Sequence, residues 1–267
     1  NQVTYLIKEK YQQELAQGVI LYHINQDKKR KKPLRFSNFQ TVTSWQSAAE
    51  KRWDLIILCI STSALHEGFD FDGLKAVLGD ATLLLLQPGP EDRALVEGHV
   101  APAQIVQGMI TLVSYHTPMP GEQTAVPGTA YWLPPMTPMP FAGEIMRRTA
   151  VIQTFIAAGI GAKSIQDMRD VSLFSNAFFM VFLTALEASD WKFKKLRDNT
   201  SMIEQMLQAN QEAFEAISAT YQVAVPFWSK WVHVWMVKSA LRVAPHAVPF
   251  DLEAFMQVHF TKVKAQT

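Results

Sequence analysis

The sequence predicts a chain in two halves, an α/β domain built on a parallel sheet and then an all-α domain. Two uninterrupted apolar runs, Leu55–Ile60 and Thr82–Leu86, support the first half. An apolar run without polar alternation is typical of a strand buried on both faces, as in parallel sheets. Leu74, Val77 and Leu78 lie between these runs with helical spacing. Strand signals almost disappear in the second half of the chain, which predicts helices there.

Each apolar run ends in residues that form loops. Ser61 and Thr62 follow the first run, and Gln87, Pro88 and Gly89 follow the second. In an open α/β sheet, ligands bind just outside the carboxyl ends of the strands. The sequence therefore predicts a nucleotide site at these two loops.

Composition allows a large core and favours no highly charged partner. The 267 residues suffice for one large domain or two ordinary ones, with 48% hydrophobic and 18% charged residues. The 25 Lys and Arg residues balance 24 Asp and Glu residues, a formal net charge of +1. This balance gives no reason to expect nucleic acid or an anionic membrane as a partner.

Several features favour a cytoplasmic protein. The single cysteine, Cys59, lies in an apolar run, so we expect it in the core of a protein from a reducing compartment. The longest apolar segment, Phe174–Leu186, is shorter than the roughly 18–20 residues of a membrane span. The start of the sequence resembles no signal peptide.

The residues before the first apolar run predict small elements. Val3–Ile7 has the composition of a strand. Val19–Ile24 and Leu34–Phe39 have the composition of two short strands joined as a hairpin, and Trp45–Arg52 predicts a short helix. The turn of the hairpin carries a basic run, Lys28–Lys32, which could contact phosphate or act as a localisation signal. A solvated hairpin tip is the preferred interpretation, because no basic or aromatic residues continue the patch.

After the second run the pattern changes in two steps. Pro90 suits the first turn of a helix, and Ile105–Tyr115 predicts one or two strands. The proline-rich segment Pro118–Phe141 is expected to be irregular, except for a strand-like piece at Ala130–Leu133. Four or five helices are then expected, within Phe141–Ala158, Ser172–Ser189, Ser201–Thr220, Val225–Leu241 and Phe250–Val263. The predicted domains are therefore residues 1–140 and 141–267, and the tryptophans are expected to pack inside them.

Known short motifs are missing from the sequence. One cysteine and seven scattered histidines give no zinc-ligand spacing, and no Walker loop, HExxH or GxSxG motif occurs. Gly159 and Gly161 form a Gly-x-Gly, but it follows a predicted helix rather than a strand. We therefore interpret it as a helix stop and not as a dinucleotide-binding turn.

Five segments together resemble the ketopantoate reductase (2-dehydropantoate 2-reductase) family. They are WDLIILCISTSAL from Trp53, ATLLLLQPGPEDRALV from Ala81, QIVQGMITLVSYHT from Gln104, PFAGEIMRRTAVIQTFIAAGI from Pro140 and SNAFFMVFLTALEAS from Ser175. The resemblance covers nearly the whole chain in order and pattern more than in identical residues. It implies a Rossmann-type domain and a helical domain that hold NADPH and a 2-oxo acid in the cleft between them.

The resemblance also implies an incomplete first domain. In the family, a strand, a Gly-x-Gly-x-x-Gly turn and a helix precede a strand like Val3–Ile7. About 25–30 residues, most of one βαβ unit, would therefore precede the printed sequence. The turn that binds the pyrophosphate would lie among them.

The resemblance implies a set of binding residues. The cofactor would contact Lys8, Ile60, Ser61, Gln87, Pro88 and Gly89. Lys8, at the end of the presumed second strand, would select the 2′-phosphate of NADP, a role that Lys10 could share, although both could be plain surface charges. Asn176 matches the position of an asparagine that binds substrate in the family, although it could be an ordinary buried polar residue.

Several positions depart from the family pattern. Ser61 replaces a frequent lysine, Pro88 an asparagine, Ser172 the catalytic lysine and Met180 a second asparagine. Reduction of a ketone requires a donor that protonates the developing alkoxide. Lys262 and His259, three residues apart on the last predicted helix, are the candidate replacements. A solvated helix end, or a cap of the contact between the domains, is the alternative for both.

Two hypotheses follow. The first is an NADP-dependent reductase that transfers a hydride from NADPH to a small 2-oxo acid or related carbonyl. The second is a non-catalytic relative that binds a dinucleotide as a binding or assembly module, which the missing lysine favours. We expect no nucleic-acid or membrane partner, and we consider a homodimer. Turnover of NADPH with 2-oxo acids separates the two hypotheses.

Overall fold

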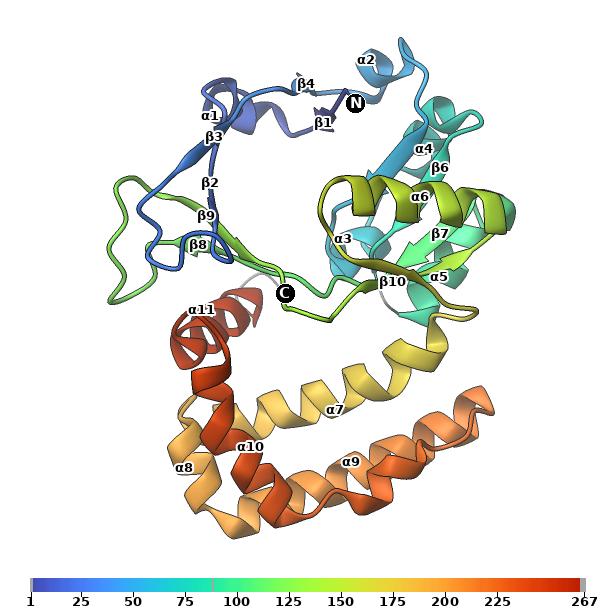
Figure 1. The fold of residues 1–267 in the computed structure, drawn as a ribbon. Coiled ribbons are helices and arrows are strands. Elements are labelled where there is room, and N and C mark those ends of the chain that lie inside the picture. The colour runs from blue at the N-terminus through green and yellow to red at the C-terminus, as the bar shows by residue number, and fades with distance from the viewer. Residues whose placement is uncertain (1, 88, 265–267) are drawn as a thin grey trace. The chain divides into compact units, whose positions relative to one another are not determined.

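The computed structural model describes residues 2–87 and 89–264, with side chains as far as Thr261 (Figure 1). The chain divides into two compact units, Asn1–Arg169 and Asp170–Thr267. This division lies later than the expected boundary near residue 140. The reason is that helix α6 (Ile145–Ala157) packs on the sheet of the first unit, and strand β11 (Ala162–Ser164) pairs with it.

A five-stranded sheet in the order β11-β10-β7-β6-β5 is the centre of the first unit. Strands β5 (Leu55–Leu58), β6 (Thr82–Leu85) and β7 (Ile105–Gly108) are parallel neighbours. The two apolar runs therefore form adjacent parallel strands, as predicted. Strand β10 (Met139–Gly143) is antiparallel to β7 and parallel to β11.

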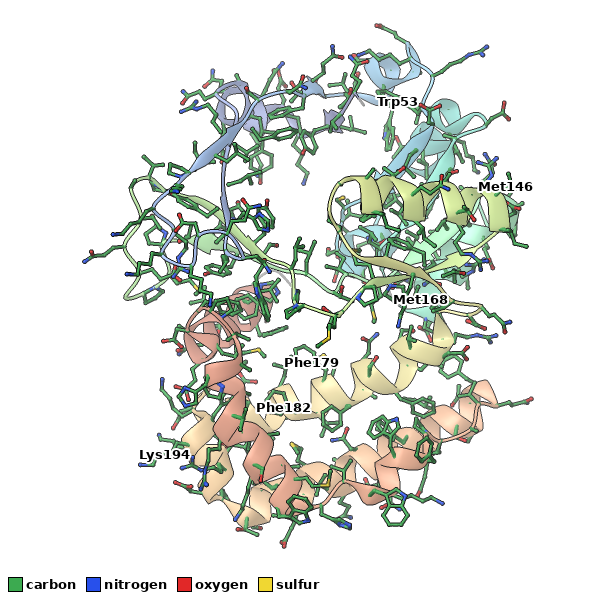
Figure 2. The ribbon with its side chains drawn as sticks, in the orientation of Figure 1. Trp53, Met146, Met168, Phe179, Phe182 and Lys194 are labelled. Carbon is green, nitrogen blue, oxygen red and sulfur yellow. The ribbon has the colours of Figure 1, made fainter. Side chains whose placement is uncertain are left out.

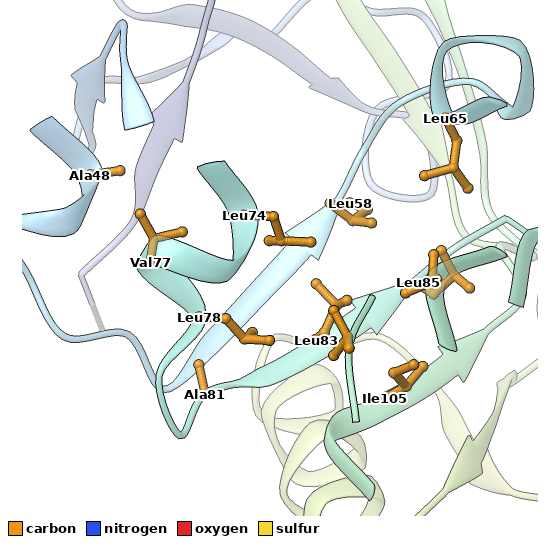
Figure 3. Packing of buried hydrophobic residues seen from close by; sticks show 12 residues of the cluster. Ala48, Leu58, Leu65, Leu74, Val77, Leu78, Ala81, Leu83, Leu85 and Ile105 are labelled. Atoms are coloured by element: carbon orange, nitrogen blue, oxygen red, sulfur yellow. The ribbon is translucent and has the colours of Figure 1, made fainter. Parts of the chain in front are cut away.

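Strand β6 is covered on both faces. On one face, Leu83 and Leu85 belong to a buried cluster with helix α4 (Phe71–Leu78), which contributes the predicted Leu74, Val77 and Leu78 (Figure 3). On the other face, Leu84 packs in a second cluster with Val151 of α6. Burial on both faces explains why this strand has no polar alternation.

Strand β5 departs from the expectation of complete burial. Ile57 is 40% exposed, and Cys59, expected in the core, is also exposed. Within the described residues β5 pairs only with β6, so it is an edge strand and its side chains are covered less than those of β6. Partial burial nevertheless raises the pKa of the Cys59 thiol.

Strand β1 (Thr4–Leu6) was expected in this parallel sheet, and this expectation is wrong. It pairs with β4 (Gln40–Val42) in a separate two-stranded parallel sheet. The backbone N–H of Ile7 donates to the carbonyl of Val42 at 2.9 Å, which extends this pairing. Within the described residues β1 pairs with β4 alone and forms no ladder with β5.

A third sheet, in the order β3-β2-β9-β8, completes the strands of the first unit. The predicted hairpin forms from antiparallel β2 (Val19–His23) and β3 (Leu34–Phe36). Strands β8 (Val113–Thr117) and β9 (Gly128–Trp132) flank part of the proline-rich segment. This segment is more regular than expected, since it contributes β9 and the first residues of β10.

The helix predicted at Phe141 begins later, at Ile145. Met139–Gly143 pairs with β7 instead, and Gly143 adopts a φ of +146°. A Cβ atom on Gly143 would lie 2.7 Å from the carbonyl oxygen of Ile105. Glycine therefore allows the two strands to approach closely before the helix starts.

The remaining elements of the first unit are short. They are the 3₁₀ helices η1 (Glu9–Tyr11) and η2 (Pro102–Gln104) and the helices α1 (Gln12–Ala16), α2 (Trp45–Ala49), α3 (Thr62–His66) and α5 (Pro90–Glu97). Helix α2 matches the short helix predicted from Trp45, and α5 begins at the proline expected to start it. Helices α3 and α5 follow the ends of β5 and β6.

The second unit is helical, as predicted. Its elements are α7 (Arg169–Glu187), α8 (Phe193–Asp198), α9 (Thr200–Tyr221), η3 (Phe227–Trp231), α10 (Val234–Ala247) and α11 (Leu252–Lys264). Helix α7, which carries Phe179 and Phe182 in Figure 2, is long and apolar enough to cross a membrane by length and composition. One such helix is weak evidence for a span, because core helices meet the same criterion. Trp231 and Trp235 are exposed, against the expectation that they pack inside.

The basic turn between β2 and β3 is not simply solvated. Arg30 donates to Oε1 of Glu122 at 2.5 Å, and the two side chains are 11% and 7% exposed. Glu122 also accepts from the hydroxyls of Tyr115 and Thr117, at 3.1 and 2.8 Å. Burial, with the Glu122 carboxylate beside it, raises the pKa of Tyr115. Arg30 therefore ties the hairpin to the segment after β8, 92 residues later.

Replacement of Glu122 tests this interaction. Glu122→Ala leaves the Arg30 guanidinium buried without its carboxylate, so we expect a loss of about 3–5 kcal/mol in the free energy of unfolding. The control is Lys29→Ala, which removes an exposed charge from the same turn and should change stability by about 0.5 kcal/mol or less. Urea unfolding of both variants measures the difference; equal effects would contradict a structural role for the pair.

Candidate functional site

The carboxyl ends of β5 and β6 carry the residues expected to bind a cofactor. Ser61 is the N-cap of α3, and its Oγ accepts from the backbone N–H of Ala64 at 3.1 Å. Ile60 is partly buried against the main core cluster. The first loop is therefore held by a helix cap and by packing, and its serine hydroxyl already has a partner.

Gln87 connects the two strand ends. Its side chain is almost completely buried, and Nε2 donates to the carbonyls of Ile60 at 2.5 Å and Leu58 at 3.4 Å. The side-chain amide of Gln107 donates to the carbonyl of Gln87 at 3.1 Å. Among the described residues, Oε1 of Gln87 has no hydrogen-bond partner although it is buried. This orphan acceptor lies at the edge where an α/β sheet binds ligands.

Gly89 begins helix α5. Its backbone N–H donates to Oδ2 of Asp92 at 3.2 Å, which closes the first turn of the helix. A Cβ atom on Gly89 would lie 2.7 Å from the same oxygen, so glycine allows this close contact. Pro88, the other expected binding residue of this loop, lies outside the described residues.

A histidine and an aspartate form a hydrogen-bonded pair at the same edge. His66, the last residue of α3, has Nε2 2.9 Å from Oδ1 of Asp92 on α5. Asp92 is 2% exposed and also accepts from the hydroxyl of Thr62 at 3.3 Å. The sequence gives little reason to pair these residues, because 26 positions separate them. Their places, just beyond two neighbouring strand ends, are the signal that could have suggested it.

Lys8 lies apart from this edge. It precedes η1 and follows β1, which belongs to the two-stranded sheet, and its side chain is exposed. Lys10 lies over the ring of Tyr11, with Nζ 4.9 Å from the ring centre. Of the two lysines considered for a phosphate contact, Lys10 thus already has a neighbour for its charge.

Helix α7 carries the positions compared with the substrate-binding and catalytic residues of the family. Ser172, at the place of the catalytic lysine, is 1% exposed, and its hydroxyl has no partner among the described residues. Asn176, one turn later, is half-buried, and Met180 is exposed. The side chain at position 172 therefore faces the core, and it is a hydroxyl rather than an ionisable amine.

Helix α11 carries the two residues considered as a replacement acid. His259 stacks on Phe255 with ring centres 5.3 Å apart, and Phe260 meets its ring at 4.8 Å. Desolvation lowers the pKa of His259, although part of the ring surface is exposed. The side chain of Lys262 lies outside the described residues. Glu253 on this helix has a structural partner, since it binds the ammonium of Lys192 at 3.0 Å.

The predicted site residues thus fall into separate groups. Ile60, Ser61, Gln87 and Gly89 lie together at the carboxyl edge of β5 and β6. Asn176 and His259 belong to the second unit, where Phe179 and Phe260 bring α7 and α11 together with ring centres 5.6 Å apart. Among the described residues, no group of three His, Cys, Asp or Glu side chains could hold a metal ion.

Comparison with known proteins finds likeness in structure and none in sequence families. No protein-family model matches the chain, and no curated protein matches it. A 2-dehydropantoate 2-reductase from Porphyromonas gingivalis W83 is 14% identical with a TM-score of 0.62, and the match covers 98% of this chain and 88% of that one.

Two further solved structures are similar. D-mandelate dehydrogenase, in a ternary structure with NADH and anilino(oxo)acetate, is 14% identical with a TM-score of 0.63; the match covers 90% of this chain and 72% of that one. A dimeric ketopantoate reductase from Staphylococcus aureus is 8% identical with a TM-score of 0.57, over 93% of this chain and 88% of that one. At such identities the likeness establishes the fold: an α/β domain followed by a helical domain, as in ketopantoate reductases.

The buried amide of Gln87 gives a test of how this edge is held together. Gln87→Glu would place a carboxylate against the carbonyl oxygens of Ile60 and Leu58, so we expect a loss of about 1–3 kcal/mol in unfolding free energy. Gln104→Glu is the matched control, since that amide donates to the carbonyls of Gly79 and Ala81 at 2.7 and 3.2 Å but is more exposed. Urea unfolding compares the two variants. A smaller loss for Gln87→Glu than for the control would contradict the arrangement.

Proposed function

We propose that this protein is an NADP-dependent reductase that transfers a hydride from NADPH to a small 2-oxo acid or a related carbonyl compound. The observation that carries the proposal is the buried, unpartnered Oε1 of Gln87 at the carboxyl edge of a parallel sheet. The similar folds of 2-dehydropantoate 2-reductases and D-mandelate dehydrogenase support it.

The residues at this edge fit the nicotinamide end of a dinucleotide. A carboxamide N–H₂ is a hydrogen-bond donor, and Gln87 Oε1 is a buried acceptor without a partner among the described residues. When bound, the dihydronicotinamide supplies a hydride for two-electron reduction. In this proposal Ile60, Ser61, Gln87, Pro88 and Gly89 line the cofactor site, and residues 1–140 form the dinucleotide-binding domain.

The second domain, predicted as residues 141–267 and compact from Asp170 onward, would provide the substrate contacts and the dimer interface. The half-buried amide of Asn176 would donate a hydrogen bond to the substrate. A homodimer is part of the proposal because a structurally similar ketopantoate reductase is dimeric. We propose a cytoplasmic location, with neither nucleic acid nor membrane as a partner.

His259 and Lys262 remain the candidates on α11 for the proton donor. The lowered pKa of His259 weakens its case, because a ring desolvated by Phe255 and Phe260 favours the uncharged form at neutral pH. An uncharged imidazole is a much weaker acid than an imidazolium.

Oxidation of NADPH tests the function. The purified protein should lower the absorbance of NADPH at 340 nm with at least one member of a panel of small 2-oxo acids, and form the corresponding 2-hydroxy acid. Gln87→Met, which removes the acceptor oxygen, should weaken NADPH binding measured by fluorescence, whereas Gln104→Met at the opposite edge should not. Absence of both NADPH binding and turnover would contradict the proposal.

In this proposal the choice of NADPH over NADH rests on Lys8 through the family resemblance alone, since β1 lies outside the five-stranded sheet. An ammonium–phosphate hydrogen bond contributes about 1.5–3 kcal/mol, so Lys8→Ala should reduce the preference for NADPH about 10- to 140-fold. Lys29→Ala, which removes an exposed lysine elsewhere, is the control. Dissociation constants for both cofactors measure the preference, and an unchanged ratio in Lys8→Ala would remove Lys8 from this role.

A second function is favoured by one observation. The position of the family's catalytic lysine is Ser172, which is buried and carries no ionisable group. This supports a relative that binds a dinucleotide without turnover, as a binding or assembly module. Binding of NADPH without product from any 2-oxo acid of the panel would select this function over the first.

A further inference from the structure

We propose that His66, held by Asp92, is the proton donor to the substrate carbonyl oxygen. The inference rests on the proposed reductase function and names a group that the family pattern does not provide. It starts from a requirement of the reaction: hydride addition to a ketone creates an alkoxide, which must be protonated. The position of the family's lysine is the buried Ser172, and the proton is assigned here to His66 in place of the α11 candidates His259 and Lys262.

The geometry around Asp92 is that of a carboxylate that orients a histidine. Asp92 is 2% exposed, so it is shielded from water, and its Oδ1 lies 2.9 Å from Nε2 of His66. Its other oxygen, Oδ2, accepts from the N–H of Gly89 at 3.2 Å and the hydroxyl of Thr62 at 3.3 Å. These contacts fix the carboxylate between α3 and α5, and the carboxylate in turn fixes the ring.

His66 itself remains accessible. Its side chain is 40% exposed, whereas that of Asp92 is 4% exposed. With Nε2 directed at the carboxylate, Nδ1 is the nitrogen available for a ligand, and it has no hydrogen-bond partner among the described residues. A ring with one nitrogen anchored and the other open can present a proton in a defined direction.

The position agrees with the rest of the site. His66 ends α3, the helix that Ser61 caps immediately after β5, and Asp92 lies three residues after Gly89. Both residues therefore belong to the edge that also holds the buried, unpartnered oxygen of Gln87. A carbonyl compound bound beside the nicotinamide at this edge would have an imidazole on the same side of the sheet.

The step balances. The carbonyl carbon receives the hydride with its two electrons, and the π electrons of the C=O bond pass to the oxygen. The N–H bond at Nδ1 of His66 breaks, and its proton forms the O–H bond of the 2-hydroxy acid. His66 is left uncharged and regains a proton from water, so the cycle consumes one hydride and one proton per carbonyl reduced.

Single-turnover kinetics test the role of His66. With enzyme in excess over NADPH and a saturating 2-oxo acid, His66→Gln and His66→Ala should slow hydride transfer about 10²- to 10⁴-fold. His116→Gln, which changes an exposed histidine on β8, is the control and should leave the rate unchanged. A rate in the His66 variants equal to that of the control overturns the inference.

Chemical rescue separates a proton donor from a structural residue. Free imidazole should restore turnover in His66→Ala in proportion to its concentration, and it should leave the rate of the His116→Gln control unchanged. Asp92→Asn tests the positioning residue, because asparagine can still cap α5 but cannot hold an imidazolium in the same way. It should lower kcat with little change in KM, and a KM change alone overturns the positioning role.

A spectroscopic measurement gives an answer independent of turnover. NMR correlation of the ring protons and nitrogens of His66 should show a hydrogen bonded to Nε2 in the wild type. The chemical shift of Nε2 should change in Asp92→Asn. Addition of oxamate, an analogue of a 2-oxo acid, with NADP⁺ should shift Nδ1 and not Nε2. No response of Nδ1 overturns the inference, whereas absence of NADPH binding and turnover in the wild type refutes the proposed function itself.

Discussion

The first unit depends on the burial of strand β6 between two parallel neighbours and two layers of side chains. Leu83, Leu84 and Leu85 are fully buried, and successive residues point to opposite faces. Each buried leucine contributes about 1.5–3 kcal/mol, so the strand anchors α4 on one face and α6 on the other. The ends of β5 and β6 therefore lie at fixed places, and the polar residues that follow them form one edge.

At that edge the polar groups satisfy one another with one exception. Ser61 caps α3, Gly89 starts α5 with the help of Asp92, and Gln87 ties the two strand ends. Only Oε1 of Gln87 is buried without a partner there among the described residues, and only His66 combines exposure with a buried carboxylate. The edge therefore combines one buried, unpartnered acceptor with one accessible imidazole, and these two groups are the basis of the proposed site.

Much of the fold could be predicted from local pattern. The apolar runs predicted two adjacent parallel strands, which form. The helical spacing of Leu74, Val77 and Leu78 predicted a buried helix face, and the pattern of the second half predicted helices. The errors share one cause. The exposure of Ile57 and Cys59, the separate pairing of β1 and the inclusion of α6 in the first unit all depend on which element lies beside which. Neighbours of this kind leave little trace in the pattern of a single segment.

The sequence by itself determined the types of most elements and the loops that would carry the candidate site, because hydrophobic period and loop residues act over a few positions. Only the tertiary structure decided the partners. Arg30 meets Glu122 across 92 positions, and His66 meets Asp92 across 26. A polar side chain finds its partner only after strands and helices have packed, so the residues around each of these positions do not name the partner, and only the order of the strands brings His66 and Asp92 to one edge.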